Sequence, residues 1–258
     1  MDALYLYKHS KQDDSEILYS LRSLERYAPY IRKVWIFGDR PHFLSNDRSI
    51  VECVPHSDLA GVLGVSVPVT NSFLLLALSS LIPELEFEYL KFSDDYVLMR
   101  DYPPEEARKD RFLEDLSQVS SRSTGLWIDS LWRTYDVLAR LGYSGFNFEI
   151  HAPTYLTKRR ALEAYRDFRD FVTEDRWFGM LGPTAILNHA VKHGQTQLVN
   201  IVEEESRLGY IVEQPRYEDI VLDSEGKTFL FFDDEAFGPA IRRFLEERFP
   251  TPSRYEQT

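Results

Sequence analysis

The sequence has a single cysteine, Cys53, so no disulfide bond can form within the chain. Cys53 lies in the strand-like run 49–54, where we expect a buried thiol rather than a nucleophile. The lack of disulfides fits a reducing compartment. The chain start lacks the basic and apolar regions of a signal peptide, and the longest apolar run, 72–82, is too short to span a bilayer. We therefore expect a soluble, cytoplasmic protein.

The chain also has fewer basic than acidic residues: it contains 30 lysines and arginines and 42 acidic residues, which gives a net charge of −12. This balance argues against broad, non-specific binding of nucleic acids, which requires a basic surface. A local basic groove stays possible. The densest basic cluster is Lys158, Arg159 and Arg160, which either contacts a phosphate backbone or forms the solvated start of a helix.

Several common catalytic motifs are missing. The chain has no GxGxxG, GxxxxGK[ST], GxSxG or HExxH motif, and one cysteine cannot make a zinc ribbon. These absences argue against Rossmann dehydrogenases, P-loop enzymes, elbow-type serine hydrolases and zincins.

The first hundred residues alternate between strand and helix patterns. Buried-strand or helix patterns occur in the order strand, helix, strand, strand, helix, strand, at 3–7, 15–29, 33–38, 49–54, 71–81 and 88–92. This alternation predicts an α/β domain with a mainly parallel sheet flanked by helices. Such sheets bind ligands beyond the carboxyl ends of their strands. The loop 8–14, in which Asp13 or Asp14 is expected to cap the first helix, and the turn 93–95 both follow strands, so we expect both at that edge.

The rest of the chain predicts a helical portion. We expect a charged helix after Pro104, a helix at 126–142 ending at a glycine, and a strand at 145–153. Further helices are expected at 158–171 and 183–194, and a closing helix at 234–250. The hydrophobic content of 43% is enough for one large core.

The adjacent Asp94 and Asp95 are the first candidates for chemistry, since they directly follow a predicted strand. Two carboxylates there supply the hard oxygen ligands that Mg²⁺ or Mn²⁺ prefers. Such an ion can neutralise a leaving phosphate. A turn with two solvated aspartates is the alternative.

Glu149 and His151 are the next candidates. In a strand they would point to the same face, where they could supply a general base and a metal ligand. The alternative for His151 is an ordinary core histidine. His189 and His193 lie one helical turn apart, a spacing that can bind metal, but no third ligand is near in sequence, so we interpret them as helix surface. Arg22 either pairs with a diphosphate or forms a salt bridge.

Several segments resemble a known family. These are YKHS (7–10), EILYSLRSL (16–24), GDRPHFL (38–44), SDD (93–95), HAP (151–153) and the tail FPTPSRYE (249–256). Together they resemble the TET/JBP-associated glycosyltransferases, a GT-A-type group with phage enzymes and relatives of the base-J DNA glucosyltransferase. The Stealth group of sugar-phosphate transferases is a more distant resemblance, sharing the LRSL helix, the DD turn and H-x-P. Its first strand normally carries a V-D-G-x-D-like stretch, where this chain has KHSKQDD.

The resemblance implies a GT-A-like catalytic domain over 1–258, with a nucleotide-sugar-binding half at 1–100 and an acceptor-side half at 101–258. The donor, a UDP-sugar, would contact residues drawn from several loops: Lys8, His9, Ser10, Arg22, Asn71 and Ser93. Because Ser93 stands where the family has asparagine, any donor contact of that asparagine is changed here. Mn²⁺ or Mg²⁺ would bind Asp94, Asp95 and His151, and Glu149 with Asp94 would be catalytic.

The resemblance also implies an acceptor. Phage-like relatives favour a 5-hydroxymethylpyrimidine in DNA, with Lys158, Arg159 and Arg160 on the DNA, after base flipping. The protein would then act in the host cytoplasm if it is phage-encoded. The first alternative is a transferase that moves a sugar or a sugar phosphate to a saccharide, as the Stealth group does. The second is a catalytically silent protein that binds nucleotides or glycans.

Overall fold

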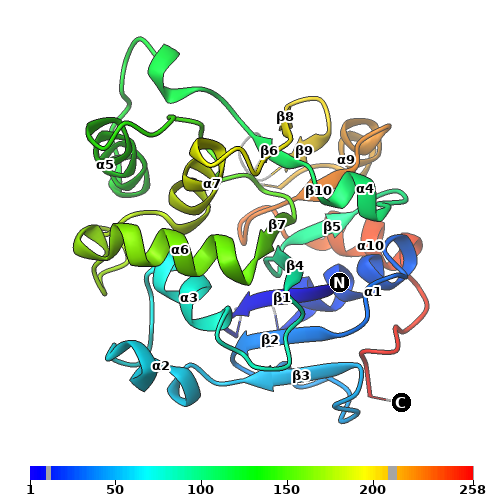
Figure 1. Ribbon diagram of the computed structural model, residues 1–258. Coiled ribbons are helices and arrows are strands. Elements are labelled where there is room, and N and C mark those ends of the chain that lie inside the picture. Colours follow the sequence, from blue (N-terminus) through cyan, green and yellow to red (C-terminus); the bar gives the residue numbers. More distant parts are fainter. Residues whose placement is uncertain (10–12, 209–213, 258) are drawn as a thin grey trace.

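A computed structural model describes residues 1–9, 13–208 and 214–257 (Figure 1). Its centre is a five-stranded sheet in the order β3-β2-β1-β4-β7. The strands are β1 (Asp2–Tyr7), β2 (Val34–Gly38), β3 (Val51–Val54), β4 (Glu88–Phe92) and β7 (Thr154–Thr157). The first four are parallel and β7 runs antiparallel to β4. The predicted α/β class with a mainly parallel sheet is confirmed.

Both faces of the sheet are covered, which explains why its strands are continuous apolar runs. Successive side chains of β1 point to opposite faces: Tyr5 packs with α1 (Ser15–Tyr27), and Leu4 packs with three other helices. Those helices are α3 (Ser72–Ser79), α6 (Lys158–Phe168) and α7 (Gly182–Lys192), which lie together on the far side of the sheet from α1 (Figure 1).

Two small sheets flank the central one. The first has the order β5-β10-β9, with β5 (Tyr96–Leu98), β10 (Phe229–Phe231) and β9 (Glu205–Arg207); the second pairs β6 (Asp110–Phe112) with β8 (Leu198–Asn200). The remaining helical elements are α2 (Ser57–Leu63), α4 (Pro104–Ala107), η1 (Leu116–Gln118), α5 (Leu126–Arg140), η2 (Arg169–Phe171), α9 (Tyr217–Ser224) and α10 (Pro239–Arg248). Within the residues described, no helix is both long enough and apolar enough to cross a membrane.

The predicted strand at 145–153 is wrong. This segment makes one isolated bridge, at Phe146, and the real strand, β7, begins at Thr154. Backbone groups of residues 145–147 pair with the backbone of residues 113–116, but this pairing is too short to count as a strand, and side chains of α7 hold other backbone groups of the segment. Asn188 accepts from the Phe146 N–H and donates to the Phe146 carbonyl, and Thr184 accepts from the Phe148 N–H at 3.2 Å. The alternating apolar pattern therefore marks burial without a ladder.

Two helix predictions also need correction. The charged helix predicted after Pro104 is only the short α4, which stops at Ala107. β6 follows, in which Arg111 is buried and paired with Glu204 on the neighbouring chain segment. The closing helix begins only at Pro239. By contrast, α5 ends as predicted, with Gly142 in the left-handed conformation at φ 72°.

Candidate functional site

Asp94 and Asp95 lie in the short turn between β4 and β5. Since β5 is antiparallel to β10, the start of β5 lies beside the end of β10, and Tyr96 pairs with Phe231. The carboxylates that precede Tyr96 thus meet those that follow Phe231. Together they line a pocket of about 220 Å³, here named the carboxylate pocket, formed by Glu16, Asp94, Asp95, Phe232, Asp233, Asp234 and Glu235.

The electrostatics of the carboxylate pocket show an excess of negative charge. Burial, with Asp234 adding to it, raises the pKa of Asp94 to about 6, although Lys91 opposes the change. Burial and the neighbouring Asp94 raise the pKa of Asp95 well above its ordinary value. Burial also lowers the pKa of Lys91. Lys91 therefore does not offset the burial and mutual repulsion of Asp94 and Asp95, and a bound cation would stabilise these two carboxylates in their ionised form.

One carboxylate oxygen of Asp95 lacks a hydrogen-bond partner among the described residues. Within the described part of the chain, its Oδ1 is buried and has no hydrogen-bond partner. A buried acceptor without a partner is uncommon in proteins, and a bound ion can satisfy such an atom. Carboxylate oxygens are the ligands of Mg²⁺ and Mn²⁺. The residues present thus fit a divalent cation held by Asp94 and Asp95.

Glu149 lies in the segment 145–153, which side chains of α7 help to hold, and its charge interacts with that of Lys91. Its Oε1 accepts a 3.0 Å hydrogen bond from the backbone N–H of Thr184, in the first turn of α7. Burial raises the pKa of Glu149, while the Thr184 N–H and Lys91 pull it down. Lys91 itself donates to Ser93 Oγ at 2.9 Å, so Ser93 is tied to the same group of charges. A partly buried carboxyl with a raised pKa can accept a proton, so the predicted base keeps suitable chemistry.

His151 lies against the two strands that end at the carboxylate pocket. Its ring stacks on Phe231 with centroids 3.8 Å apart, and it meets the edge of Tyr96 at 6.3 Å. The Tyr96 hydroxyl donates to the Ile150 carbonyl at 2.9 Å, which fixes the chain next to His151. The structure therefore brings His151 to the same end of β5 and β10 as the aspartates. Its role as a metal ligand stays a prediction.

The loop after β1 presents Lys8 and His9 at the surface, and Ser10 lies outside the described residues. The His9 ring contacts Asp14, and its backbone N–H donates to Asp39. The donor contacts predicted for Lys8, His9 and Ser10 stay predictions.

The sequence predicted that Asp13 or Asp14 caps α1. Asp14 stands at the N-cap position, but its side chain makes no capping hydrogen bond. Instead its carboxylate accepts from the Tyr7 hydroxyl and from the backbone N–H of His42, and it contacts the His9 and His42 rings. Burial raises the pKa of Asp14, but these contacts outweigh burial and lower it to about 2. Asp14 therefore organises the surface loops at the carboxyl edge of β1.

Asn71 is the N-cap of α3, and both ends of its amide have partners. Its Oδ1 accepts from the N–H groups of Phe73 and Leu74, and its Nδ2 donates to the Asp175 and Met180 carbonyls. Asn71 is also 1% exposed. The structure thus gives Asn71 a structural role, and a donor contact gains no support from this placement.

For Arg22 the structure shows the salt-bridge alternative. Its guanidinium makes two hydrogen bonds to Glu256, at 2.8 and 2.7 Å, and donates to the Phe249 carbonyl. This pair fastens the C-terminal tail onto α1. A diphosphate contact by Arg22 gains no support from these contacts.

The basic cluster at the start of α6 does not form one cationic surface. Lys158 donates to the Ile82 and Pro83 carbonyls, and Arg160 is buried in an ion pair with Asp110. Arg159 is exposed. The prediction that these three residues contact a DNA backbone together is not supported by this arrangement.

Sequence reasoning found two of the six acidic residues that line the carboxylate pocket and missed Glu16, Asp233, Asp234 and Glu235. Glu16 comes from the first turn of α1, and Asp233 and Asp234 follow β10. A signal for the second pair was present, because FLFFDD repeats the pattern of EYLKFSDD, in which two aspartates follow an apolar strand. For Glu16 the sequence held only an acidic residue in a helix start, which is common.

Comparison with solved structures defines the class of fold. The galactosyltransferase LgtC, solved with donor and acceptor sugar analogues, aligns over 98% of both chains with a TM-score of 0.50 and 14% sequence identity. This likeness confirms the predicted GT-A-like fold.

Comparison of sequences points to one region of the chain. Residues 10–115 match the model of Stealth protein CR2, conserved region 2. Similar proteins include the N-acetylglucosamine-1-phosphotransferase subunits alpha/beta of Mus musculus, at 31% identity over 37% of this chain. An exopolysaccharide phosphotransferase of Streptomyces coelicolor is 32% identical over 35% of this chain, and a capsular polysaccharide phosphotransferase of Actinobacillus pleuropneumoniae is 24% identical over 58%.

The chain spans only part of these relatives, with matches to 8%, 15% and 44% of their lengths in the same order. These similarities favour the Stealth resemblance, which the sequence placed second. They do not show the TET/JBP-associated group.

Proposed function

We propose that this chain is a metal-dependent sugar-phosphate transferase that uses a nucleotide sugar as donor and a saccharide hydroxyl as acceptor. The observation that carries the proposal is the carboxylate pocket at the carboxyl edge of a GT-A-like sheet, with Asp94 and Asp95 inside the stretch that matches the Stealth region. The names of three similar proteins, all phosphotransferases, support the same chemistry.

The donor would lie at the carboxyl ends of β1 and β4, where parallel sheets bind ligands. Asp94 and Asp95 would hold Mg²⁺ or Mn²⁺ there, with His151 as a further ligand. When bound, the ion would offset the negative charge of the donor diphosphate. We assign residues 1–100 to the donor side and 101–258 to the acceptor side, except that Asp233 and Asp234 come to the pocket from the second half.

Glu149 would accept the proton of the acceptor hydroxyl. The hydroxyl oxygen then bonds to the phosphorus next to the sugar, and the bond between that phosphorus and the bridging oxygen of the diphosphate breaks. A nucleoside monophosphate leaves and the sugar stays on its phosphate. The hydrogen bond from the Thr184 N–H would keep the partly buried Glu149 oriented toward the acceptor.

A DNA acceptor is less well supported than a saccharide. The predicted DNA-binding residues Lys158 and Arg160 are engaged with other parts of the chain, and the net charge of −12 opposes binding of a polyanion. Two of the similar proteins are named as phosphotransferases of exopolysaccharide and of capsular polysaccharide.

The product of the reaction tests the proposal. The protein would be incubated with Mg²⁺ or Mn²⁺, a panel of UDP-sugars and simple oligosaccharides, and the products followed by phosphorus NMR and mass spectrometry. A phosphodiester product that is lost in Asp95→Asn, but kept in the exposed control Asp101→Asn, supports the proposal. A hexose added without phosphate would make the protein a glycosyltransferase. Donor binding without turnover would favour the silent binder.

A further inference from the structure

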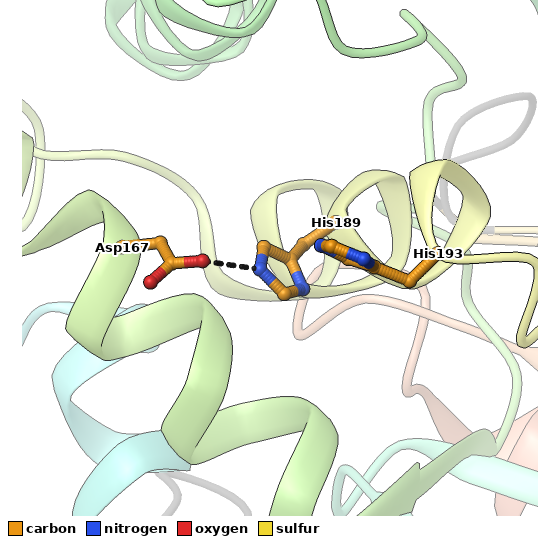
Figure 2. Close-up of side chains that lie close together, drawn as sticks. All are labelled: Asp167, His189 and His193. Carbon is orange, nitrogen blue, oxygen red and sulfur yellow. Dashed lines mark hydrogen bonds and ion pairs between the residues drawn. The ribbon is translucent and has the colours of Figure 1, made fainter.

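A second group of potential ligands lies away from the carboxylate pocket, on α6 and α7. Figure 2 shows Asp167 in the last turn of α6 facing His189 on α7, with His193, the C-cap residue of α7, beside His189. The carboxylate Oδ2 of Asp167 is 2.9 Å from His189 Nε2. One ligand atom from each residue lies within 4.8 Å of the others. The third ligand that the sequence did not reveal is therefore supplied by a different helix.

The surroundings hold His189 in a fixed orientation. His189 is 3% exposed, stacks on Tyr143 at 5.8 Å and meets the edge of Phe168 at 5.7 Å. Its ring centroid is 4.5 Å from that of His193. Because residues four apart share one face of a helix, both imidazoles reach the space next to Asp167.

The neighbouring charges leave one oxygen of Asp167 directed at the histidines. Arg166 donates to Asp167 Oδ1 at 2.8 Å, so the other oxygen, Oδ2, meets His189. The second cation beside the cluster, Lys192, lies over the Tyr143 ring at 3.9 Å and donates to the Leu141 carbonyl. Arg166 thus contacts the carboxylate oxygen that does not meet His189, and Lys192 is held by the Tyr143 ring and the Leu141 carbonyl.

We propose that Asp167, His189 and His193 bind a divalent transition-metal ion, with Zn²⁺ as the best fit, that clamps α7 to α6. Two imidazoles and one carboxylate suit zinc and other late first-row metals, whereas Mg²⁺ prefers oxygen ligands alone. Zinc bonds of about 2.0–2.2 Å place tetrahedral ligand atoms roughly 3.4 Å apart. The 2.9 Å contact between Asp167 and His189 would therefore open slightly, and His193 would move to fit the ion. The exposed His193 can make this small adjustment, and water completes the coordination.

The clamp bears on the position of Glu149. Thr184, whose N–H holds Glu149, precedes His189 by five residues on α7, a rise of roughly 7.5 Å. Asn188, next to His189, holds Phe146 of the same segment. Fixing the C-terminal end of α7 against α6 would therefore steady the helix that positions this segment.

The test is metal binding by tag-free protein treated with EDTA. Zn²⁺ would be titrated by calorimetry with excess Mg²⁺ present to occupy the carboxylate pocket, and Co²⁺ would be followed by its visible absorption. We expect one equivalent of Zn²⁺ to bind and to raise the melting temperature. His193→Gln, at an exposed position, and Asp167→Asn should each weaken binding at least tenfold while the circular dichroism spectrum is unchanged.

The matched control is His42→Gln, an equally accessible histidine that also contacts an aspartate, Asp14. It should leave Zn²⁺ affinity unchanged. The proposal is overturned if the parent shows no Zn²⁺ binding and no thermal shift at millimolar metal. It is also overturned if His42→Gln removes the binding or if His193→Gln and Asp167→Asn leave it intact.

Discussion

The carboxylate of Glu149 accepts a 3.0 Å hydrogen bond from the backbone N–H of Thr184, at the start of α7. A helix N-terminus favours a negative charge, so this contact orients the carboxylate while burial raises its pKa. The position of the proposed base is therefore set by a helix that belongs to a different part of the chain.

The first prediction concerns Glu149→Gln. The amide oxygen can still accept from Thr184, so the fold should be preserved, but the side chain can no longer accept a proton. We expect turnover to fall by about 10² to 10⁴-fold. Steady-state kinetics with the exposed Glu225→Gln as control measure this. Undiminished turnover in Glu149→Gln would remove it from the reaction.

The second prediction is that Asp95→Asn makes the metal-free protein more stable. It removes one of two adjacent, partly buried carboxylates and a buried oxygen that has no hydrogen-bond partner among the described residues. We expect a gain on the order of 1 kcal/mol, with loss of activity, as is common where a site is destabilised for function. Urea unfolding in EDTA measures the gain. A marked loss of stability would mean that Asp95 serves the fold.

The third prediction separates a structural Arg22 from a donor-binding one. Arg22 and Glu256 are 14% and 8% exposed at their side chains, so their double-mutant coupling should be about 2 kcal/mol. The surface pair of Arg48 with Glu52, where Arg48 is 80% exposed, should give less than about 1 kcal/mol. Arg22→Ala should leave the KM for the donor unchanged. A large rise in KM with little loss of stability would restore the diphosphate role.

The fourth prediction is a pH dependence from Asp14. Its pKa is lowered from 3.8 to about 2, against the effect of burial, by Tyr7, His9 and His42. Since the folded-state pKa lies below the unfolded one, the stabilisation is fully present above pH 4 and disappears as the pH falls toward 2. The stability difference between the parent and Asp14→Asn should therefore shrink over that range. A difference that is constant between pH 7 and pH 2 would contradict this.

Much of the central sheet could be predicted because its signals are local. An apolar run predicts the strand at 3–7, and helical spacing of apolar residues predicts the helix at 15–29. Both are present, as β1 and α1. The segment 145–153 could not be predicted in this way. Its backbone partners are the side chains of Thr184 and Asn188, about forty residues away, and the backbone of residues 113–116, and no local pattern encodes them.

The candidate site likewise contains residues that local sequence could predict and residues that only distant contacts bring into it. Asp94 and Asp95 could be found because they directly follow a strand of the sheet. Asp234 joins them only through the antiparallel pairing of β5 with β10, a contact between residues more than a hundred positions apart. The sequence likewise did not reveal Asp167 as the third residue of the proposed zinc site, because Asp167 lies on a different helix from His189.

The nucleotide released from the donor tests the central claim most directly. The protein would be given a UDP-sugar and Mg²⁺ or Mn²⁺, with and without oligosaccharide, and the nucleotide products separated by ion-exchange chromatography. Attack at phosphorus must release UMP, and even slow hydrolysis by water would leave a sugar 1-phosphate. We predict UMP, with release lost in Asp95→Asn. Release of UDP would show attack at the sugar carbon and would contradict sugar-phosphate transfer.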